Sequence, residues 1–326
     1  MMRNFPNLQR QDTAMPGASP HRRAGLAGLG AALLAPALPI VPARAAIPPF
    51  RGKLGSFEIS VVSDGTLNVP LSFALPDTPA TEAAKLFASQ GMPPEGLVPQ
   101  TNVTLVNTGG ELVLIDAGSG PKFQPTAGKL SENLEAAGID PKTISKVVFT
   151  HGHADHLWGA IDDFDDAERF PNAKYVISAA EWDFWTHPDT PSRSPDWMKG
   201  MAIGSARILK QIEKKVERRN AGDTVAPGMI YVATPGHTPG HMAVGVENGG
   251  QQLLVGGDVF NNNAVSFAKP EWRVGSDFDP NQGMTTRKQL LDQLATDRIP
   301  LIGFHLSWPG YGMIERRGPA YRFVPV

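Results

Sequence analysis

The 326-residue sequence contains no cysteine. This absence excludes disulfide bonds, thiolate zinc sites and thiol nucleophiles together. Any metal site in the chain must then be built from nitrogen and oxygen ligands, which come mainly from histidine, aspartate and glutamate. A chain without thiols also tolerates an oxidising compartment, although this tolerance is not by itself evidence of export.

The sequence also has no excess of charge of either sign and no long basic run. Its formal net charge is −2, and 19% of its residues are charged. The missing basic run argues against nucleic-acid binding. The hydrophobic fraction of 41% is that of a globular protein, and 34 glycines and 30 prolines indicate many turns. The length suits one large domain or two ordinary ones.

The N-terminal segment has the pattern of an export signal. Arg22-Arg23 precede the apolar run 24–41, which ends in Ala43-Arg44-Ala45 before a small residue. Paired arginines favour the bacterial twin-arginine route. The alternative is a disordered or membrane-anchoring tail, but the run is short and interrupted by prolines. We therefore expect residues 1–45 to be a cleaved signal, residues 46–326 to be one periplasmic or secreted domain, and no stable membrane anchoring after cleavage.

Short apolar runs and amphipathic segments alternate along the chain, which predicts a layered α/β fold. The strands expected from these runs are 57–62, 103–107, 112–115, 144–149, 174–177, 229–233, 242–246, 252–255 and 301–304. The helices expected from amphipathic spacing are 80–89, 130–137, 179–185, 203–218 and 285–295. Residues 186–200, rich in proline, serine and tryptophan, are predicted to form a loop or lid.

Polar residues with metal-binding or catalytic potential recur just past the ends of the expected strands. They are Asp64, Asp116, His151, His237, Asp258 and His305. Rigid strands of a layered fold position loops at one edge, and functional side chains commonly lie on such loops. The sequence therefore predicts that these residues lie near one another.

The densest group of candidate ligands is the stretch from His151 to His156, which holds three histidines and one aspartate. Imidazole nitrogen and carboxylate oxygen bind borderline divalent ions such as zinc. Four donors this close in the chain are too many for one tetrahedral ion. They fit two adjacent ions, provided that further ligands come from elsewhere.

Three later residues supply those ligands. We assign His151, His153 and His237 to one ion, Asp155, His156 and His305 to the other, and Asp258 as the bridge. Two metals about 3.5–4 Å apart can share a water, lower its pKa towards about 7 and polarise a carbonyl or phosphoryl oxygen. We expect a metal-bridged hydroxide to attack such a centre, and the carboxylates of Asp155 and Asp258 to orient it or accept its proton. Zn²⁺ is the expected ion, with manganese, cobalt and iron as alternatives.

Other polar residues near these positions are expected to support the ligands. Asp64 and Asp116 are predicted to orient metal-binding histidines through the second ring nitrogen. His241 could be an eighth ligand, but a supporting or packing role is favoured because the ligand set is already full.

The ligand pattern, His151-x-His153-x-Asp155-His156 followed by His237, Asp258 and His305, resembles the metallo-β-lactamase superfamily in its binuclear hydrolase form. Asp116, within Leu-Ile-Asp-Ala-Gly, matches an early structural aspartate of that superfamily. The resemblance implies an αββα sandwich with the metals at one edge of the two sheets, and a hydrolase domain over residues 46–326.

The closer resemblance is to the methyl parathion hydrolase branch, which neighbours the acyl-homoserine lactonases. It rests on Gly55 to Ile59 with Ser63-Asp64-Gly65, on Gly236 to His241, on His305 to Gly310 and on Tyr321 to Val326. In that branch aromatic side chains line the substrate pocket. Similar positions here are Phe123, Trp185 and Trp197, although the tryptophans could equally be core residues. Members of the branch are often dimers, so a homodimer is also expected.

The resemblance favours hydrolysis of a small-molecule lactone or ester, with phosphotriester hydrolysis close behind. β-Lactam hydrolysis is an alternative, although histidine-rich zinc β-lactamases lack a bridging aspartate like Asp258 and other types use cysteine. Iron redox chemistry of the sulfur dioxygenase kind is a second alternative on the same scaffold. A non-catalytic metal-binding module is a third.

Overall fold

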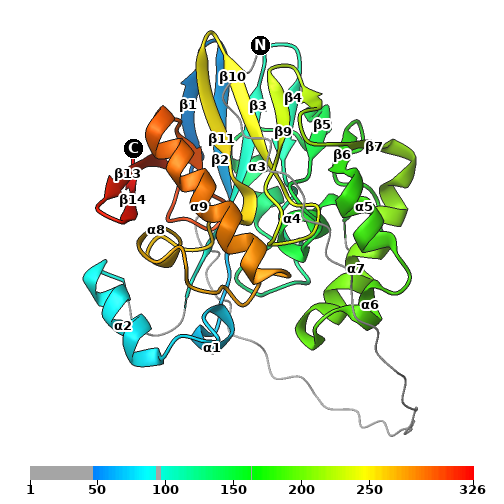
Figure 1. Ribbon diagram of the computed structural model, residues 1–326. Helices are drawn as coiled ribbons and strands as arrows, with labels where there is room; N and C mark the ends of the chain where they lie inside the picture. The colour runs from blue at the N-terminus through cyan, green and yellow to red at the C-terminus, as the bar shows by residue number, and fades with distance from the viewer. Residues whose placement is uncertain (1–46, 93–96, 163) are drawn as a thin grey trace, which may run out of the picture.

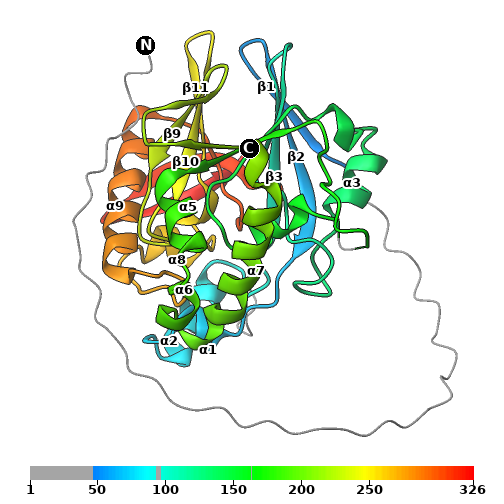
Figure 2. The same ribbon diagram turned by 90° about the vertical axis from the view of Figure 1, so that its right-hand side faces the viewer.

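Two β-sheets pack face to face and helices cover their outer faces, as Figures 1 and 2 show. The computed structural model describes residues 47–92, 97–162 and 164–326, so the expected leader lies outside the described residues. Figure 2 shows α9 and α3 on opposite sides of the molecule with both sheets between them. The αββα sandwich predicted from the sequence is confirmed.

The first sheet has seven strands in sequential order from β1 to β7. The strands are β1 (Phe50–Leu54), β2 (Phe57–Thr66), β3 (Gln100–Asn107), β4 (Leu112–Ile115), β5 (Lys146–Val148), β6 (Lys174–Ser178) and β7 (Val216–Arg219). Strands β1 to β4 pair antiparallel, whereas β4 to β7 run parallel.

The second sheet also has seven strands, in the order β14-β13-β12-β11-β10-β9-β8. The strands are β8 (Thr224–Ala226), β9 (Met229–Ala233), β10 (Met242–Asn248), β11 (Gln251–Val255), β12 (Leu301–Ile302), β13 (Tyr311–Arg317) and β14 (Ala320–Pro325). Only the β11–β12 pairing in this sheet is parallel among the described strands.

The helices differ in position as well as in length. They are α1 (Leu71–Ala74), α2 (Ala80–Ser89), α3 (Leu130–Ala136), α4 (Ala154–Leu157), α5 (Ala179–Thr186), α6 (Thr190–Arg193), α7 (Asp196–Ile212), α8 (Val265–Ala268) and α9 (Pro280–Asp297). Helices α3, α5 and α7 contribute to the core on the outer face of the first sheet, and α8 and α9 to that of the second. Figure 1 shows α1 and α2 apart from these layers, at the lower end of the molecule.

Alternation along the central strands explains why both faces of the first sheet are covered. Leu114 and Val147 point to the helical face, while Val113, Ile115 and Val148 point to the second sheet. Successive strand residues project to opposite faces, so an unbroken apolar run buries both. The core between the sheets contains residues of both, and their packing holds the two sheets together.

Several expected elements differ from the structure. The expected helix 203–218 begins earlier, at Asp196, and its last residues belong instead to β7, which pairs with β6. The expected loop or lid 186–200 contains α6 and the start of α7. The strand near 301 is not the last, because β13 and β14 follow it. The secondary structure of these segments depends on pairing with strands distant in the sequence, which local sequence patterns do not reveal.

The strand ends that position the site lie at one edge of the sandwich. His151 follows β5 of the first sheet, while His237, Asp258 and His305 follow β9, β11 and β12 of the second. Packing of the sheets brings these four loops together, which explains how ligands far apart in sequence meet. Among the described residues, no helix is long and apolar enough to cross a membrane.

Candidate metal centre

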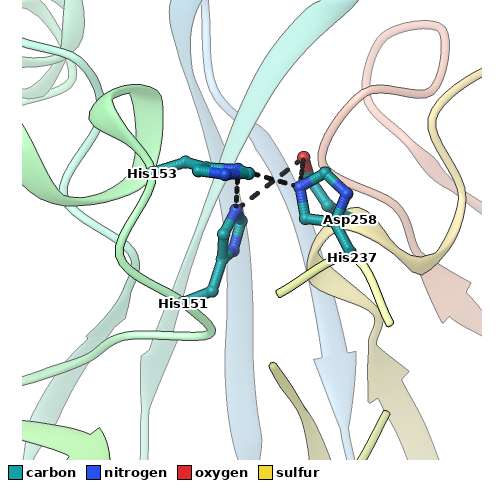
Figure 3. A group of neighbouring side chains, drawn as sticks. All are labelled: His151, His153, His237 and Asp258. Carbon is teal, nitrogen blue, oxygen red and sulfur yellow. Dashed lines mark hydrogen bonds and ion pairs between the residues drawn. The ribbon is translucent and has the colours of Figure 1, made fainter. Parts of the chain in front are cut away.

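The first ligand group consists of His151, His153, His237 and Asp258, shown in Figure 3. Nδ1 of His153 lies 2.9 Å from Nε2 of both His151 and His237. Oδ2 of Asp258 lies 3.2 Å from Nε2 of His237 and 4.0 Å from Nε2 of His151. Three ring nitrogens and one carboxylate oxygen therefore converge on one small volume.

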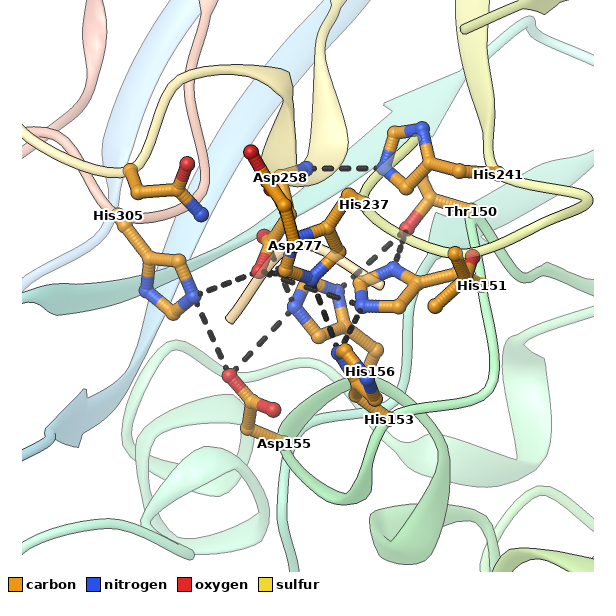
Figure 4. A network of polar contacts seen from close by, with 12 residues as sticks. Thr150, His151, His153, Asp155, His156, His237, His241, Asp258, Asp277 and His305 are labelled. Carbon is orange, nitrogen blue, oxygen red and sulfur yellow. Dashed lines mark hydrogen bonds and ion pairs between the residues drawn. The ribbon is translucent and has the colours of Figure 1, made fainter. Parts of the chain in front are cut away.

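The second group consists of Asp155, His156, Asp258 and His305, which Figure 4 shows beside the first. Nε2 of His305 lies 3.0 Å from Oδ2 of Asp258 and 3.3 Å from Oδ2 of Asp155. Nε2 of His156 lies 3.0 Å from Oδ1 of Asp258. Asp258 is thus common to both groups, and both of its oxygens face histidine nitrogens.

The hydrogen bonds of the histidines show which nitrogens are left for a metal. Nδ1 of His156 donates to Oδ2 of Asp116 at 2.8 Å, and Nδ1 of His237 donates to Oδ1 of Asp277 at 3.1 Å. Nδ1 of His305 donates to the Gln100 carbonyl at 2.8 Å. Carboxylates and carbonyls only accept, so the proton lies on Nδ1 and the Nε2 lone pair faces the centre.

This arrangement fits two divalent cations and is poor as a hydrogen-bond network. Lone pairs that face one another at such distances repel unless a cation lies between them. Nitrogens bound to one tetrahedral zinc at about 2.0–2.1 Å lie about 3.3 Å apart, close to the spacings observed. Nε2 of His156 and Oδ1 of Asp258 are also buried without a hydrogen-bond partner. Such orphaned polar atoms are expected where a metal completes the coordination.

The pKa values of the histidines also show that the buried carboxylates favour positive charge at this centre. Burial lowers the pKa of His151 and His153, and neighbouring histidines lower it further. Burial would also lower the pKa of His237 and His305, but Asp258 and the other adjacent carboxylates raise it to about 9 and about 10. The carboxylates thus stabilise positive charge at this centre, which protons on His156, His237 and His305 supply in the protein alone and which divalent cations would replace.

Asp116 joins the β4 end to the histidine loop. Its Oδ1 accepts the backbone N–H of Thr150 at 2.7 Å, and its Oδ2 accepts the Thr150 hydroxyl at 2.8 Å as well as the ring of His156. Burial raises the pKa of Asp116, although these donors oppose the shift. The carboxylate therefore fixes the ring of His156 and the start of the loop together.

Asp64 is placed differently from the sequence-based expectation. Its carboxylate accepts the backbone N–H groups of Ser119, Gly128 and Leu130 at 2.8–3.2 Å and contacts no histidine. Burial raises its pKa to about 6, although these hydrogen bonds lower it. The residue lies inside β2, because the strand continues beyond its apolar part. Its carboxylate stabilises the conformation of the segment 118–130 through these hydrogen bonds and orients no ligand directly.

His241 contacts the ligand set through the backbone of Asp258. Its Nε2 accepts the Asp258 N–H at 3.0 Å, and its Nδ1 therefore donates to the Thr234 hydroxyl at 2.8 Å. Burial, and then the charge of His237, lowers the pKa of His241 to about 3. The ring is thus a neutral hydrogen-bond acceptor that holds the backbone of the bridging residue Asp258.

Glu181 is a buried carboxyl group that sequence reasoning missed. It accepts hydrogen bonds from the indole N–H of Trp185 and from the hydroxyl of Thr238, which follows His237. Burial raises its pKa to about 7, although these hydrogen bonds lower it. The ring of Trp185 in turn packs edge-on against His153, with centroids 5.5 Å apart. Glu181 therefore supports the two loops that carry the histidines of the first ligand group.

A cavity of about 290 Å³ opens over the ligands. Its floor contains His153, Asp155, His237, Asp258 and His305, and its apolar wall is formed by Leu67, Val69, Pro70, Phe73, Ala74, Leu75, Leu97, Pro99, Phe123, Trp197, Met201, Val265 and Val274. Phe123 and Trp197, which the sequence suggested for a substrate pocket, both line this cavity. Trp185 is fully buried and is not among the lining residues. It supports His153 from behind.

A further residue that sequence reasoning missed is Asp277, whose contact with His237 is visible in Figure 4. No strand-end pattern marks it, since it lies in the irregular segment before α9. The start of α9 provides an indirect signal. Asp279 caps that helix by accepting the N–H of Gln282 at 3.0 Å.

Comparison with known proteins agrees with this geometry. The family model described as "Metallo-beta-lactamase superfamily" matches residues 96–302. The structure of AidC, described as a dizinc quorum-quenching lactonase in complex with a product, N-hexanoyl-L-homoserine, superimposes with a TM-score of 0.80. It is 26% identical, and the alignment covers 86% of this chain and 97% of that one.

Two curated relatives match shorter stretches. An uncharacterized protein, YobT of Bacillus subtilis, is 31% identical over 160 residues, which are 49% of this chain and 61% of that protein. The N-acyl homoserine lactonase AttM of Agrobacterium fabrum is 31% identical over 121 residues, 34% of this chain and 39% of that protein. The chain therefore spans less than two thirds of the length of these relatives.

The fold, the two ligand groups and the family match lead to one conclusion. The chain belongs to the metallo-beta-lactamase superfamily. Within it, the similar proteins of known activity reported above are lactonases, which agrees with the branch indicated by the sequence.

Proposed function

We propose that the protein is a two-metal hydrolase that opens a neutral lactone or cleaves a neutral carboxylic ester. The observation that carries this proposal is the pair of ligand groups sharing Asp258 on the floor of an apolar cavity. A shared carboxylate brings two ions close enough to act on one substrate atom. The similarity to a dizinc lactonase and to AttM supports the same reaction class.

When bound, two divalent ions would supply an acidified water and polarise the carbonyl oxygen of the ester. The protein's own part is to hold and orient. The carboxylates of Asp155 and Asp258 line the cavity beside the ligand histidines, where in their ionised form they can accept a hydrogen bond from the attacking water and orient it. Their neighbouring histidines keep them ionised: burial alone would raise the pKa of Asp258, but His305 and His156 lower it well below its usual range.

The cavity wall favours substrates without charge. Among the described residues that line it there is no lysine or arginine, so a free carboxylate or phosphate would meet neutral amide and hydroxyl groups but no countercharge except the metal site itself. Desolvating an unpaired anion in such a cavity is costly. The common β-lactam antibiotics carry a carboxylate, and this feature makes them poorer substrates than a neutral lactone.

A neutral phosphotriester is the second candidate, because it meets the same requirement of an uncharged, apolar substrate with an electrophilic centre. The uncharged wall that disfavours β-lactams admits it equally. Iron redox chemistry on this scaffold stays an alternative that metal analysis separates from hydrolysis.

The test is a screen of the purified protein with lactones, aryl esters, phosphotriesters and β-lactams, loaded with zinc and separately with manganese. Turnover of lactone or ester that exceeds turnover of the other classes supports the proposal. The exposed Asp292→Ala variant should match the wild type, whereas Asp258→Ala should lose turnover by a factor of at least about 100. Turnover of β-lactam alone, or equal activity of both variants, would refute it.

Export and dimerisation stay predictions from the sequence. We propose that residues 1–45 direct twin-arginine export and are removed. Determination of the N-terminal residue of the protein recovered from the periplasm of a bacterial host tests this, and a retained leader in the cytoplasm would contradict it. Light scattering of the purified protein tests the dimer.

A further inference from the structure

Arg287 is a buried cation that the ligand assignment does not use. It lies on α9, and only 1% of its surface is exposed. Arginine is almost never buried to this extent unless its charge and N–H groups are matched by partners. The identity of those partners therefore indicates its role.

The guanidinium of Arg287 reaches towards both ligand groups. Its Nη2 donates to Oδ2 of Asp277 at 3.0 Å, and its Nε donates to the carbonyl of Val259 at 3.0 Å. Nη1 donates to the Pro270 carbonyl at 3.3 Å. The planar fork of an arginine can satisfy such diverging acceptors at once, which a lysine ammonium on its flexible stem does not do with the same geometry.

Two of these acceptors lead directly to metal ligands. The other oxygen of Asp277, Oδ1, accepts Nδ1 of His237 at 3.1 Å. Val259 is the residue after Asp258, so its carbonyl belongs to the short turn that presents the bridging carboxylate. One side chain therefore connects a ligand of the first group with the ligand that both groups share.

Resting on the proposal that His237 and Asp258 hold the metal ions, we propose that Arg287 is a positioning residue for both of them. Through Asp277 it fixes the ring of His237 with Nε2 towards the site. Through Val259 it fixes the turn that carries Asp258. The spacing between the two ligands then depends on one rigid guanidinium group.

A purely structural role for Arg287 would be to hold α9 on the sheet, but other contacts already do this. Leu290, Leu291 and Leu294 of the same helix are buried in the outer core. The Thr286 hydroxyl also donates to the Pro235 carbonyl at 2.7 Å, beside the His237 turn. Loss of the guanidinium should therefore disturb the metal site more than the attachment of the helix.

The experiment compares wild type with Arg287→Met, Arg287→Lys and Asp277→Asn by titrating the metal-free protein with cobalt(II). Binding is followed by visible absorption, whose ligand-field bands report the geometry around the ion. A competing chelator gives the affinities. The matched control is Arg169→Met, because Arg169 also joins carbonyls to a carboxylate, those of Gly159, Ile161 and Asp162, away from the ligands.

Arg287→Met and Asp277→Asn should weaken cobalt binding by about 10- to 100-fold and shift the absorption bands. Arg287→Lys should keep the charge yet show an intermediate loss. Arg169→Met should lower the melting temperature without moving the bands. The double variant Arg287→Met/Asp277→Asn should melt higher than Arg287→Met, because no unpaired buried carboxylate remains.

Wild-type affinity and bands in both Arg287→Met and Asp277→Asn would overturn the positioning role while leaving the metal site intact. Identical band shifts in Arg169→Met would overturn it as well, since the effect would then be general. Failure of the wild-type protein to bind cobalt would overturn the proposed function itself.

Discussion

The backbone N–H of Asp258 donates a 3.0 Å hydrogen bond to Nε2 of His241. This bond fixes the peptide of the residue that both ligand groups share, and it requires a neutral imidazole with its proton on Nδ1. Burial favours that neutral form, since it lowers the pKa of His241 to about 3. The bridging carboxylate is thus held by a side chain that is not itself a ligand.

Replacing His241 by phenylalanine should therefore weaken the site without removing a ligand. The Asp258 N–H would lose its acceptor, at a cost of about 1–3 kcal/mol in stability. Metal affinity should fall by about 10-fold or more. Urea unfolding and metal titration measure both effects. The exposed His187→Phe is the control, and equal behaviour of the two variants would refute this role.

Gly257 should not accept a side chain. Its φ of +51° is left-handed, and a Cβ there would lie 2.7 Å from Nε2 of His241. Gly257→Ala should therefore cost the left-handed strain of about 1–2 kcal/mol and also displace His241. Gly250→Ala, with φ +76° and no atom within 4 Å, isolates the strain alone. Equal loss of metal affinity in the two variants would contradict the proposed contact.

Trp197 should govern the binding of substrates with a large apolar group. It is 37% exposed and lines the cavity together with Phe73, whose ring it meets edge-on with centroids 5.3 Å apart. Trp197→Ala should raise KM for long-chain lactones several-fold, and by more than it lowers kcat, because it removes an apolar wall contact; its ring also lies edge-on to His153, with centroids 6.0 Å apart. Ile203→Ala, exposed on the same helix, is the control. A fall in kcat with unchanged KM would refute this assignment.

The buried Glu181 should make stability depend on pH. Burial raises its pKa from 4.5 to about 7, so the folded state binds its proton more tightly than the unfolded state does. Stability from this group is complete below pH 4.5 and is lost as the pH rises to about 7, a loss of about 3 kcal/mol. Glu181→Gln should remove this dependence.

Urea unfolding of wild type, Glu181→Gln and the exposed Glu82→Gln between pH 5 and pH 7.5 provides the measurement. Wild type and Glu82→Gln should lose about 2–3 kcal/mol more than Glu181→Gln over that window. Parallel pH profiles of all three proteins would show that the pKa of Glu181 is the same in the folded and unfolded states, which would contradict the shift caused by burial.

The sequence was informative where local pattern and chemistry coincide. The helix expected at 80–89 and the strand at 229–233 have the predicted bounds, because amphipathic spacing and an apolar run define them locally. The grouping of the candidate ligands could be anticipated because HxHxDH brings several metal-binding residue types together in one short stretch. His237, Asp258 and His305 could be added because each follows a strand.

The supporting residues could not be anticipated in the same way. Asp277, Glu181 and Arg287 carry no motif, and they act only because packing brings them behind the ligands. Arg287 in particular lies among hydrophilic residues of α9, a pattern that ordinarily indicates a solvent-exposed face of a helix. Asp64 shows the opposite error, because its motif was visible but its partners are backbone N–H groups across a loop.

The metal content of the purified protein tests the central claim most directly. Elemental analysis after dialysis should find two divalent ions per wild-type chain and two in Asp292→Ala, an exposed carboxylate. Asp258→Ala should retain fewer than one, because both groups lose their shared ligand. One ion per wild-type chain, or two ions retained by Asp258→Ala, would contradict a two-metal site bridged by Asp258.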